Sequence, residues 1–468
     1  MRYVLAAAPF VVAGVGLLGL HWSAPRAGVA ALLTAVLAAV LGSDLGLAAL
    51  LASAREGSGT AARVLYVLFG GLLLYRVLAA GGAIDAVSAY LRRIEPRPAV
   101  LGLAVVVGVS PFFESVTGFG VAIVICAPIL LGAGLSPLRA AVLASFGQCA
   151  VPWGALAVGT VLGAELAGLS LQALSDRSAL LNLPLYPLYG LAALAFAGGR
   201  PALRAHAAEA LGLGVAAGVG TLMTSVFLAP ALSGAIGGLC AVAAFLARRA
   251  RGLGAAAAPG WALSPYAVLL GLLALTNGPA AAQAALSALS PALAGPGPWL
   301  IVSAAFAAVV LGVAPPAGRD ALRATVTQWL PVALATLTFV LTGRLVADSG
   351  GAALLAGGAA AALGAGYPLV APLIGALGGA LTGSNVGSNA LFMPFQAEAA
   401  AATGKTTLGI AAAQNVAGSH ASLLAPQRLV LAAAATGLEG REGTIARAAL
   451  APVAVSLALL AAVAAIVP

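Results

Sequence analysis

The sequence contains few charged residues. Only 7% of its 468 residues are Asp, Glu, Lys or Arg, while 62% are hydrophobic and the mean hydropathy is +1.08. Soluble proteins average roughly 25% charged residues, so this composition excludes a soluble domain with the usual charged surface. Apolar runs of about 20 residues, each long enough to cross a bilayer, recur along the chain. The composition therefore predicts an all-α polytopic membrane protein.

The chain also has few residues that bind metals or carry redox chemistry, with three cysteines and three histidines. Cys126, Cys149 and Cys240 stand in apolar runs without the spacing of a ligand pair, so we expect small core residues. No HExxH motif is present, and Gly404-Lys-Thr-Thr has only the tail of a phosphate-binding loop. We therefore expect neither an enzyme nor an ATP-driven pump, with no metal site and no cofactor.

The net charge of +9 comes largely from arginines between apolar runs. One loop holds Arg92, Arg93 and Arg97, and another holds Arg248, Arg249 and Arg251. Lys and Arg collect in the cytoplasmic loops of membrane proteins and set their orientation. We therefore place both loops on the cytoplasmic side, and we expect a lipid bilayer and no nucleic acid among the partners.

The apolar runs, with half-helices allowed for, predict about eleven to fourteen crossings at roughly 20 residues each. We expect a polar break at Ser53–Thr60 and an amphipathic stretch at Ile84–Ile94. The run Ala99–Leu131 is expected to be interrupted twice, at Ser110-Pro111 and at Gly118-Phe119-Gly120. Proline removes a helical hydrogen bond and glycine permits a sharp turn, so we expect a helix break at each of these two segments.

One polar stretch lies between long apolar runs, from Gly378 to Gln396, and reads GGALTGSNVGSNALFMPFQ. Backbone facing lipid cannot stay unpaired, so such residues at membrane depth indicate a helix that breaks inside protein, around a polar cavity. A broken helix offers free N–H groups that suit an anion. Close helix packing also uses small residues, but the pairs Ser384-Asn385 and Ser388-Asn389 are more polar than packing needs.

The chain repeats itself at a nearly constant offset. Arg76–Gly82 corresponds to Arg344–Gly351, with the ends of the segments 268 and 269 positions apart. Thr117–Gly120 corresponds to Ser384–Gly387, with Gly120 and Gly387 267 positions apart. Interrupted segments at matching places in two halves indicate the binding site of a secondary transporter.

This offset predicts two transmembrane repeats joined by a connection. The first repeat covers residues 1–200, with a re-entrant motif at about 110–123, and the second covers 261–468, with its motif at about 378–396. Residues 201–260 are expected to form connecting helices and the basic loop. Gln148 follows Gly118 by thirty residues, as Asn415 follows Asn385.

Four ionisable residues in or near apolar runs have alternative interpretations. Glu114 is costly at membrane depth and is a candidate proton carrier, unless Pro111 ends the span and leaves it at the water interface. His420 could relay protons near neutral pH or be a hydrogen-bonded structural residue. Arg76 and Arg344 could extend to the interface or pair with the carboxylate of a substrate.

Three segments share a pattern with a known family. The first is Glu114-Ser-Val-Thr-Gly-Phe-Gly-Val-Ala-Ile, the second Thr382-Gly-Ser-Asn-Val-Gly-Ser-Asn-Ala-Leu-Phe, and the third Ala425-Pro-Gln followed by Ala435-Thr-Gly-Leu-Glu-Gly-Arg-Glu-Gly. In this order and at this separation, they resemble the L-lactate permease family, which also includes glycolate permeases.

The resemblance implies proton-coupled uptake of small 2-hydroxy monocarboxylates, L-lactate or glycolate, across a bacterial cytoplasmic membrane. It also implies inverted repeats with re-entrant hairpins and an elevator-like mechanism. The family often has a lysine shortly before its Ile-Ser-Pro-Gln, and the matching stretch, Ala421-Ser-Leu-Leu-Ala-Pro-Gln, lacks it. Arg428 or His420 could replace this lysine.

These arguments predict one site. The residues expected to bind the organic anion are Ser115, Thr117, Gly118, Gln148, Thr382, Ser384, Asn385, Ser388, Asn389 and Asn415. Glu114 and His420 are expected to couple transport to protons. Two alternatives stay open, a sodium-coupled transporter of dicarboxylates or inorganic oxyanions and a passive anion channel. A homodimer is compatible with the sequence, which does not decide whether Arg76, Arg344 or Arg428 meets the substrate.

Overall fold

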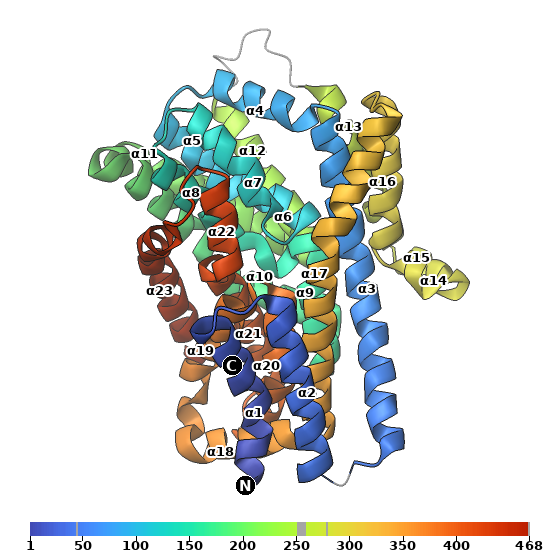
Figure 1. Ribbon diagram of the computed structural model, residues 1–468. Helices are drawn as coiled ribbons and strands as arrows, with labels where there is room; N and C mark the ends of the chain where they lie inside the picture. Colours follow the sequence, from blue (N-terminus) through green and yellow to red (C-terminus); the bar gives the residue numbers. More distant parts are fainter. Residues whose placement is uncertain (44, 250–258, 278, 467–468) are drawn as a thin grey trace.

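The computed structural model describes residues 1–43, 45–249, 259–277 and 279–466 (Figure 1). Over this range the chain is 88% helix and contains no strand. Among the described residues, ten helical segments are long and apolar enough to cross a membrane, and the pair Pro137–Cys149 and Val151–Leu166, bent by 65°, raises the number to eleven. The prediction of an all-α polytopic membrane protein is confirmed, with the crossings at the lower end of the expected range.

The helices of the first half are α1 (Arg2–Gly14), η1 (Val15–Gly19), α2 (Ala24–Gly42), α3 (Leu47–Ala80), α4 (Ala83–Ile94), α5 (Pro98–Ala104), η2 (Val105–Val109), α6 (Ser110–Thr117), α7 (Val121–Gly132), α8 (Pro137–Phe146), η3 (Gly147–Trp153), α9 (Gly154–Leu166) and α10 (Leu171–Asn182). The middle of the chain forms α11 (Leu185–Phe227), η4 (Pro230–Leu232) and α12 (Ser233–Arg249).

The helices of the second half are α13 (Gly260–Asn277), α14 (Ala280–Leu289), α15 (Pro291–Ala294), α16 (Gly297–Val310), α17 (Pro315–Asp348), α18 (Gly351–Leu363), η6 (Gly364–Gly366), α19 (Tyr367–Thr382), α20 (Asn385–Ala402), α21 (Thr407–Ala421), η7 (Ser422–Leu424), α22 (Pro426–Ala434) and α23 (Glu442–Ile466).

Two long helices, α3 and α17, pack along each other through the length of the molecule (Figure 1). Each has 34 residues, and they begin 268 positions apart. Each is followed by a left-handed glycine, Gly82 or Gly350, and a shorter helix. The order of elements therefore recurs at the offset seen in the sequence, whereas the inverted relation of the two halves stays a prediction.

The polar break expected at Ser53–Thr60 is wrong, because α3 runs through it without interruption. Its polar side chains find partners on other helices. Ser53 Oγ donates to Asp348 Oδ2 of α17 at 2.6 Å, and Thr60 Oγ1 donates to Glu165 of α9. Side chains on neighbouring helices thus provide the hydrogen-bond partners that water would provide in a loop.

The interrupted run in the first half breaks once rather than twice. Ser110-Pro111 continues the helix, because the wider π-helical turn η2 directly precedes it and accommodates a residue without an N–H. The chain does break at Gly118-Phe119-Gly120, where all three residues have positive φ angles of 70°, 54° and 79°. The matching break in the second half is at Gly383, with φ 64°.

The boundary predicted at residue 200 falls within α11. The helix leaves helical geometry at Gly199, with φ 67° and ψ −160°, and resumes at once with Pro201 inside it. The first repeat and the connecting segment are therefore joined by a kinked helix.

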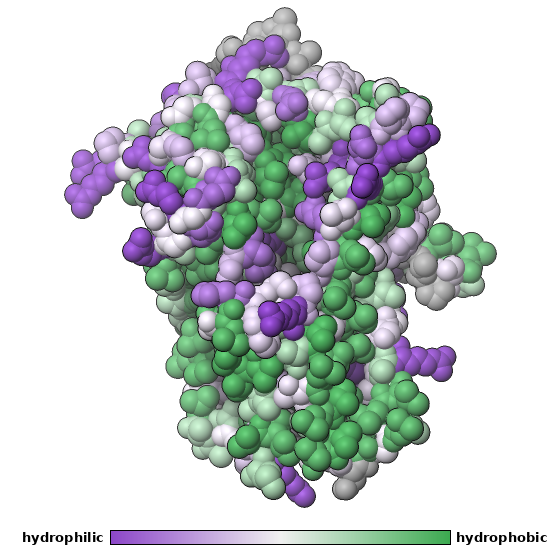
Figure 2. Space-filling model, in the orientation of Figure 1, coloured by the Kyte–Doolittle hydropathy of each residue, from purple (hydrophilic) through white to green (hydrophobic). Residues whose placement is uncertain are grey.

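The two basic clusters lie at the same end of the molecule. Arg249, the last residue of α12, contacts Glu95 Oε2 at 2.6 Å and Glu209 Oε1 at 2.8 Å. Arg97 contacts Glu95 Oε1 at 2.8 Å. This end is the hydrophilic top of the space-filling view, above an apolar surface that includes α1 and α2 (Figure 2). Arg251 and the rest of the basic loop lie outside the described residues.

The buried Glu95 carboxylate predicts a loss of stability in acid. Burial alone raises its pKa, but hydrogen bonds from Arg97 and Arg249 outweigh burial and lower the pKa to about 2, below the ordinary 4.5. The pairing therefore stabilises the fold fully above about pH 4.5, and this contribution is lost as the pH falls toward 2. Thermal unfolding in detergent should show this decline, and Glu95→Gln should flatten it, whereas Glu398→Gln, at an exposed site, should not.

Close backbone contact next to the second break gives a further prediction. A Cβ at Gly379 of α19 would lie 1.9 Å from the carbonyl oxygen of Gly418 on α21. Gly379→Ala should therefore destabilise the protein by about 1–3 kcal/mol, the usual cost of overpacking. Gly357→Ala, at a helical site with open space around it, is the matched control. Equal melting temperatures of the two variants would contradict the close packing of α19 and α21.

Candidate functional site

The centre of the site is the Glu114 carboxylate, which is fully buried near the end of α6. The break at Gly118–Gly120 turns the chain so that the Gly120 N–H donates to both carboxylate oxygens, at 3.2 and 3.1 Å. Gly120 is also the N-cap residue of α7, which begins at Val121. The carboxylate therefore lies at the positive N-terminal end of a helix, where a negative charge is stabilised.

Arg428 of α22 is the positive charge that faces Glu114. Its Nη1 lies 3.2 Å from Glu114 Oε1 and donates to Gln148 Oε1 at 2.6 Å, while its Nε donates to the Gly383 carbonyl at 2.8 Å. Gln148 Nε2 completes the group by donating to Glu114 Oε2 at 3.4 Å. One guanidinium thus joins the break of the first half, the break of the second half and the bend at η3.

A second cluster consists of amides. Asn415 Oδ1 accepts from Asn385 Nδ2 at 2.7 Å and from Asn389 Nδ2 at 2.9 Å. Asn415 Nδ2 donates to Thr160 Oγ1 at 3.0 Å and to Ser178 Oγ at 2.9 Å. The Oδ1 atoms of Asn385 and Asn389 are buried and have no hydrogen-bond partner among the described residues. Two acceptor oxygens are therefore available for a donor or a cation.

Most of the predicted hydroxyls bond to backbone near their own break. Ser384 Oγ accepts from the Gly387 N–H at 2.9 Å, which caps α20. Thr382, Thr117 and Ser388 donate to the carbonyls of Gly378, Phe113 and Gly375, respectively. Ser115 lies against Gly234 of α12, and its buried Oγ has no partner within the described chain. Of these hydroxyl residues, Ser384 lines the central cavity.

His420 belongs to a separate group. Its Nε2 lies 2.6 Å from Asn182 Oδ1, its Nδ1 lies 3.2 Å from the Tyr189 hydroxyl, and its ring stacks on Tyr189 with centroids 5.3 Å apart. Within the described residues no hydrogen bond joins it to the Glu114–Arg428 pair. This placement favours the structural interpretation of His420.

Neither Arg344 nor Arg76 contacts the central pair. Arg344 is held by two carboxylates, Glu56 of α3 and Asp348 of α17. Arg76 Nη2 donates to Gln328 Oε1 at 2.7 Å. Among the three arginines considered from the sequence, the structure brings Arg428 to Glu114.

A small central cavity lies between the two breaks. It is lined by Glu114, Gly118, Phe119, Val151, Gly154, Val158, Gly159, Ser384, Asn385, Val386 and Arg428. Its volume of about 10 Å³ is room for one water molecule, so an organic anion requires the walls to separate.

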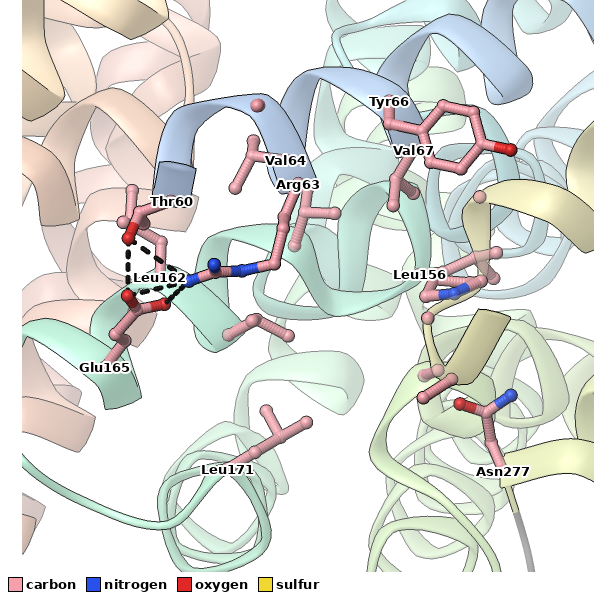
Figure 3. Close-up of a pocket in the computed structure, with 18 of the residues that line it drawn as sticks. Thr60, Arg63, Val64, Tyr66, Val67, Leu156, Leu162, Glu165, Leu171 and Asn277 are labelled. Carbon is pink, nitrogen blue, oxygen red and sulfur yellow. Dashed lines mark hydrogen bonds and ion pairs between the residues drawn. The ribbon is translucent and has the colours of Figure 1, made fainter. Parts of the chain in front are cut away.

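Larger cavities adjoin the central cavity on two sides. One of about 560 Å³ shares Phe119, Ser384 and Arg428 with it. Another, of about 590 Å³, shares Val158 and is mostly apolar (Figure 3). At one end of the latter, Arg63 is paired with Glu165 at 2.8 Å, and Thr60 donates to the same carboxylate. The central cavity thus shares lining residues with a larger cavity at Val158 and with another at Phe119, Ser384 and Arg428.

Sequence reasoning missed Thr160, Ser178 and Asn182, the partners of Asn415 and His420. Thr160 stands in an apolar helix without any local signal. Ser175, Ser178 and Asn182 recur at spacings of three and four, which places them on one face of α10. This polar stripe could have been found. No group of three or more His, Cys, Asp or Glu residues in the described part of the chain could hold a metal ion.

The Asn415 cluster can be tested by stability. Asn415→Ala removes the hydrogen bonds to four buried side chains, and such bonds contribute about 1 kcal/mol each, so we expect a loss of roughly 2–4 kcal/mol in thermal unfolding. Ser419→Ala on the same helix removes a hydroxyl that bonds only to the carbonyl of Asn415 and should change stability little. Similar losses in both variants would contradict the role of the amide cluster.

Known proteins similar to this chain identify its family. The L-lactate permease family model matches residues 2–250 and 270–468. An L-lactate permease of Streptococcus iniae is 28% identical over 113 residues, which is 24% of this chain and 24% of the relative. The aligned stretch thus spans about a quarter of the length of that relative. Because the family model covers nearly the whole chain, the protein belongs to the L-lactate permease family.

Proposed function

We propose that this protein is a secondary transporter of small 2-hydroxy monocarboxylates, L-lactate or glycolate, driven by protons across a bacterial cytoplasmic membrane. Membership of a permease family and the ten apolar helices support a membrane transporter. The observation that carries the proposal is the fully buried Arg428–Glu114 pair between two broken helices. A guanidinium in that position is the natural partner of a carboxylate.

The pair links the substrate to a proton. When Glu114 is ionised, Arg428 is neutralised, and a second carboxylate beside it would bring an unpaired negative charge into a desolvated site. When Glu114 is protonated, Arg428 Nη1 becomes free to bind the carboxylate of the substrate. Proton and monocarboxylate therefore bind together, the site keeps one positive and one negative charge, and one proton moves with each anion.

The polar groups around the pair suit a 2-hydroxy acid. The carboxylate takes the place of Glu114 on Arg428 and on the Gly120 N–H. The unpartnered Asn385 Oδ1 on the wall of the same cavity accepts the hydroxyl proton of the substrate. A monocarboxylate without a 2-hydroxyl leaves this oxygen unpaired, which costs about 1–3 kcal/mol.

The walls of the central cavity must separate for transport. Cavities adjoin it on two sides, so small movements of Phe119 or of the α9 wall at Val158 would open it one way or the other. Inverted repeats with the site at their interface are suited to such alternating access. We propose an elevator-like motion of the broken helices against α3 and α17.

One observation favours a second candidate, a sodium-coupled carrier. Asn385 Oδ1 and Asn389 Oδ1, both unpartnered, are oxygen ligands of the kind that unwound transporter helices offer to Na⁺. Replacing sodium by choline separates the candidates, because a sodium-coupled carrier loses uptake in choline and a proton-coupled carrier does not.

Uptake into proteoliposomes tests the role of the pair. Labelled L-lactate should accumulate when the pH outside is lower than inside. Arg428→Gln should lower uptake at subsaturating substrate roughly 10- to 100-fold, because a hydrogen bond to a charged group contributes about 1.5–3 kcal/mol. Absence of gradient-driven uptake of every small carboxylate by the wild type would overturn the proposed function.

Glu114→Gln separates coupling from binding. It should still exchange internal for external lactate while losing accumulation by the pH gradient. It also leaves Arg428 buried without a counter-charge, which is destabilising, so lactate should raise its melting temperature more than that of the wild type. A Glu114→Gln protein that still concentrates lactate would remove Glu114 from the proton role.

A further inference from the structure

Three cavities follow one another from the surface to the central pair. An outer cavity of about 800 Å³ shares Gln328 and Leu431 with the cavity of about 560 Å³. That intermediate cavity in turn shares Phe119, Ser384 and Arg428 with the small central cavity. Adjacent walls therefore define one path toward Arg428.

The outer cavity lies at the end where α3 finishes and α17 begins (Figure 1). Its lining comes from α3, α7, α17 and α22, and Figure 2 shows this face hollowed between α22 and α17. It is the same end of the molecule that holds Arg97 and Arg249, so the positive-inside pattern places it toward the cytoplasm.

The outer cavity is lined by more positive than negative side chains. Arg76, from α3, is half-buried, while Arg323 and Asp320, from α17, are exposed. Two positive groups and one negative group give the cavity a net positive charge. A cleft with a net charge and apolar walls concentrates ions of the opposite sign.

Arg76 has unused hydrogen-bonding capacity. Its Nη2 donates to Gln328 Oε1 at 2.7 Å, while its Nε is buried and has no partner among the described residues. No carboxylate in the described structure forms an ion pair with it, in contrast to Arg63, Arg249 and Arg344. A buried charged donor without an acceptor is costly, and a bound carboxylate would satisfy it in a bidentate manner.

We propose that Arg76, oriented by Gln328, forms an outer binding site for the carboxylate of the transported anion on the path to Arg428. This inference rests on the proposed function and adds a second site to it. An anion that enters from this side binds first where it is partly solvated, then passes Gln328 and Phe119 to the central pair, and an anion taken up leaves by the reverse path. Arg323 attracts the anion to the mouth without holding it.

Transport kinetics in proteoliposomes test the outer site. With L-lactate offered on the side to which the outer cavity opens, Arg76→Gln should raise the KM for L-lactate about 10-fold while the maximal rate changes less than 2-fold, and it should weaken the dependence of KM on ionic strength. Arg319→Gln is the matched control, because Arg319 lies on the same helix as Arg323, is exposed and does not line the cavity. Equal KM values for Arg76→Gln and Arg319→Gln in a wild type that transports would overturn the outer site and leave the proposed function intact.

Labelling tests the path independently of turnover. Thr327→Cys, at an exposed position that lines the outer cavity, should react with an anionic methanethiosulfonate reagent in a Cys240→Ser background that leaves only the buried Cys126 and Cys149. L-lactate should slow this reaction at least 3-fold, and a neutral sugar should not. A rate unchanged by lactate would overturn the outer site even if Arg76→Gln failed to fold. A wild type without uptake of any carboxylate would overturn the proposed function and this site with it.

Discussion

The buried pair of Glu114 and Arg428 is the constraint on which the rest of the arrangement depends. Taking two charges out of water costs several kcal/mol per ion, and their attraction offsets this cost only with good geometry and further hydrogen bonds. Those bonds come from the Gly120 N–H, the Gln148 side chain and the Gly383 carbonyl. Helix breaks and bends in both halves must therefore converge on one point, which explains why the polar interruptions occur in pairs.

Convergence of so many helix ends requires small residues. Apolar contacts drive helix association weakly in a membrane, so close backbone approach and hydrogen bonds between helices replace them. The 60 glycines in the chain serve this purpose where helices touch, since a Cβ at Gly343 would lie 1.8 Å from the Ala390 carbonyl oxygen and one at Gly159 would lie 2.8 Å from Asn385 Nδ2. The membrane environment thus accounts for both the low content of charged residues and the high content of small residues.

The sequence predicted the breaks at Gly118–Gly120 and Gly383 because glycine next to polar residues inside an apolar run favours a turn over a continuous helix. It failed at Ser53–Thr60, because the partners of those side chains, Asp348 and Glu165, lie 295 and 105 positions away. It failed at Pro111 because a π-helical turn leaves no distinctive residue pattern. Arg428 was considered only as a replacement for a missing lysine, since nothing local indicates that an arginine after Pro426 faces a carboxylate 314 positions earlier.

The placement of the two charges in different halves has a mechanistic consequence. Glu114 belongs to the first half and Arg428 to the second, so their bond holds the broken helices of the two halves together. In the proposed transport cycle, protonation of Glu114 weakens that bond, and a substrate carboxylate then binds Arg428 in its place. Movement with neither proton nor substrate bound keeps the pair intact, while movement with a proton alone leaves Arg428 unpaired in a dry site, at a cost of several kcal/mol. In the proposed cycle this cost prevents a proton leak, and coupling follows from electrostatics without a dedicated gate.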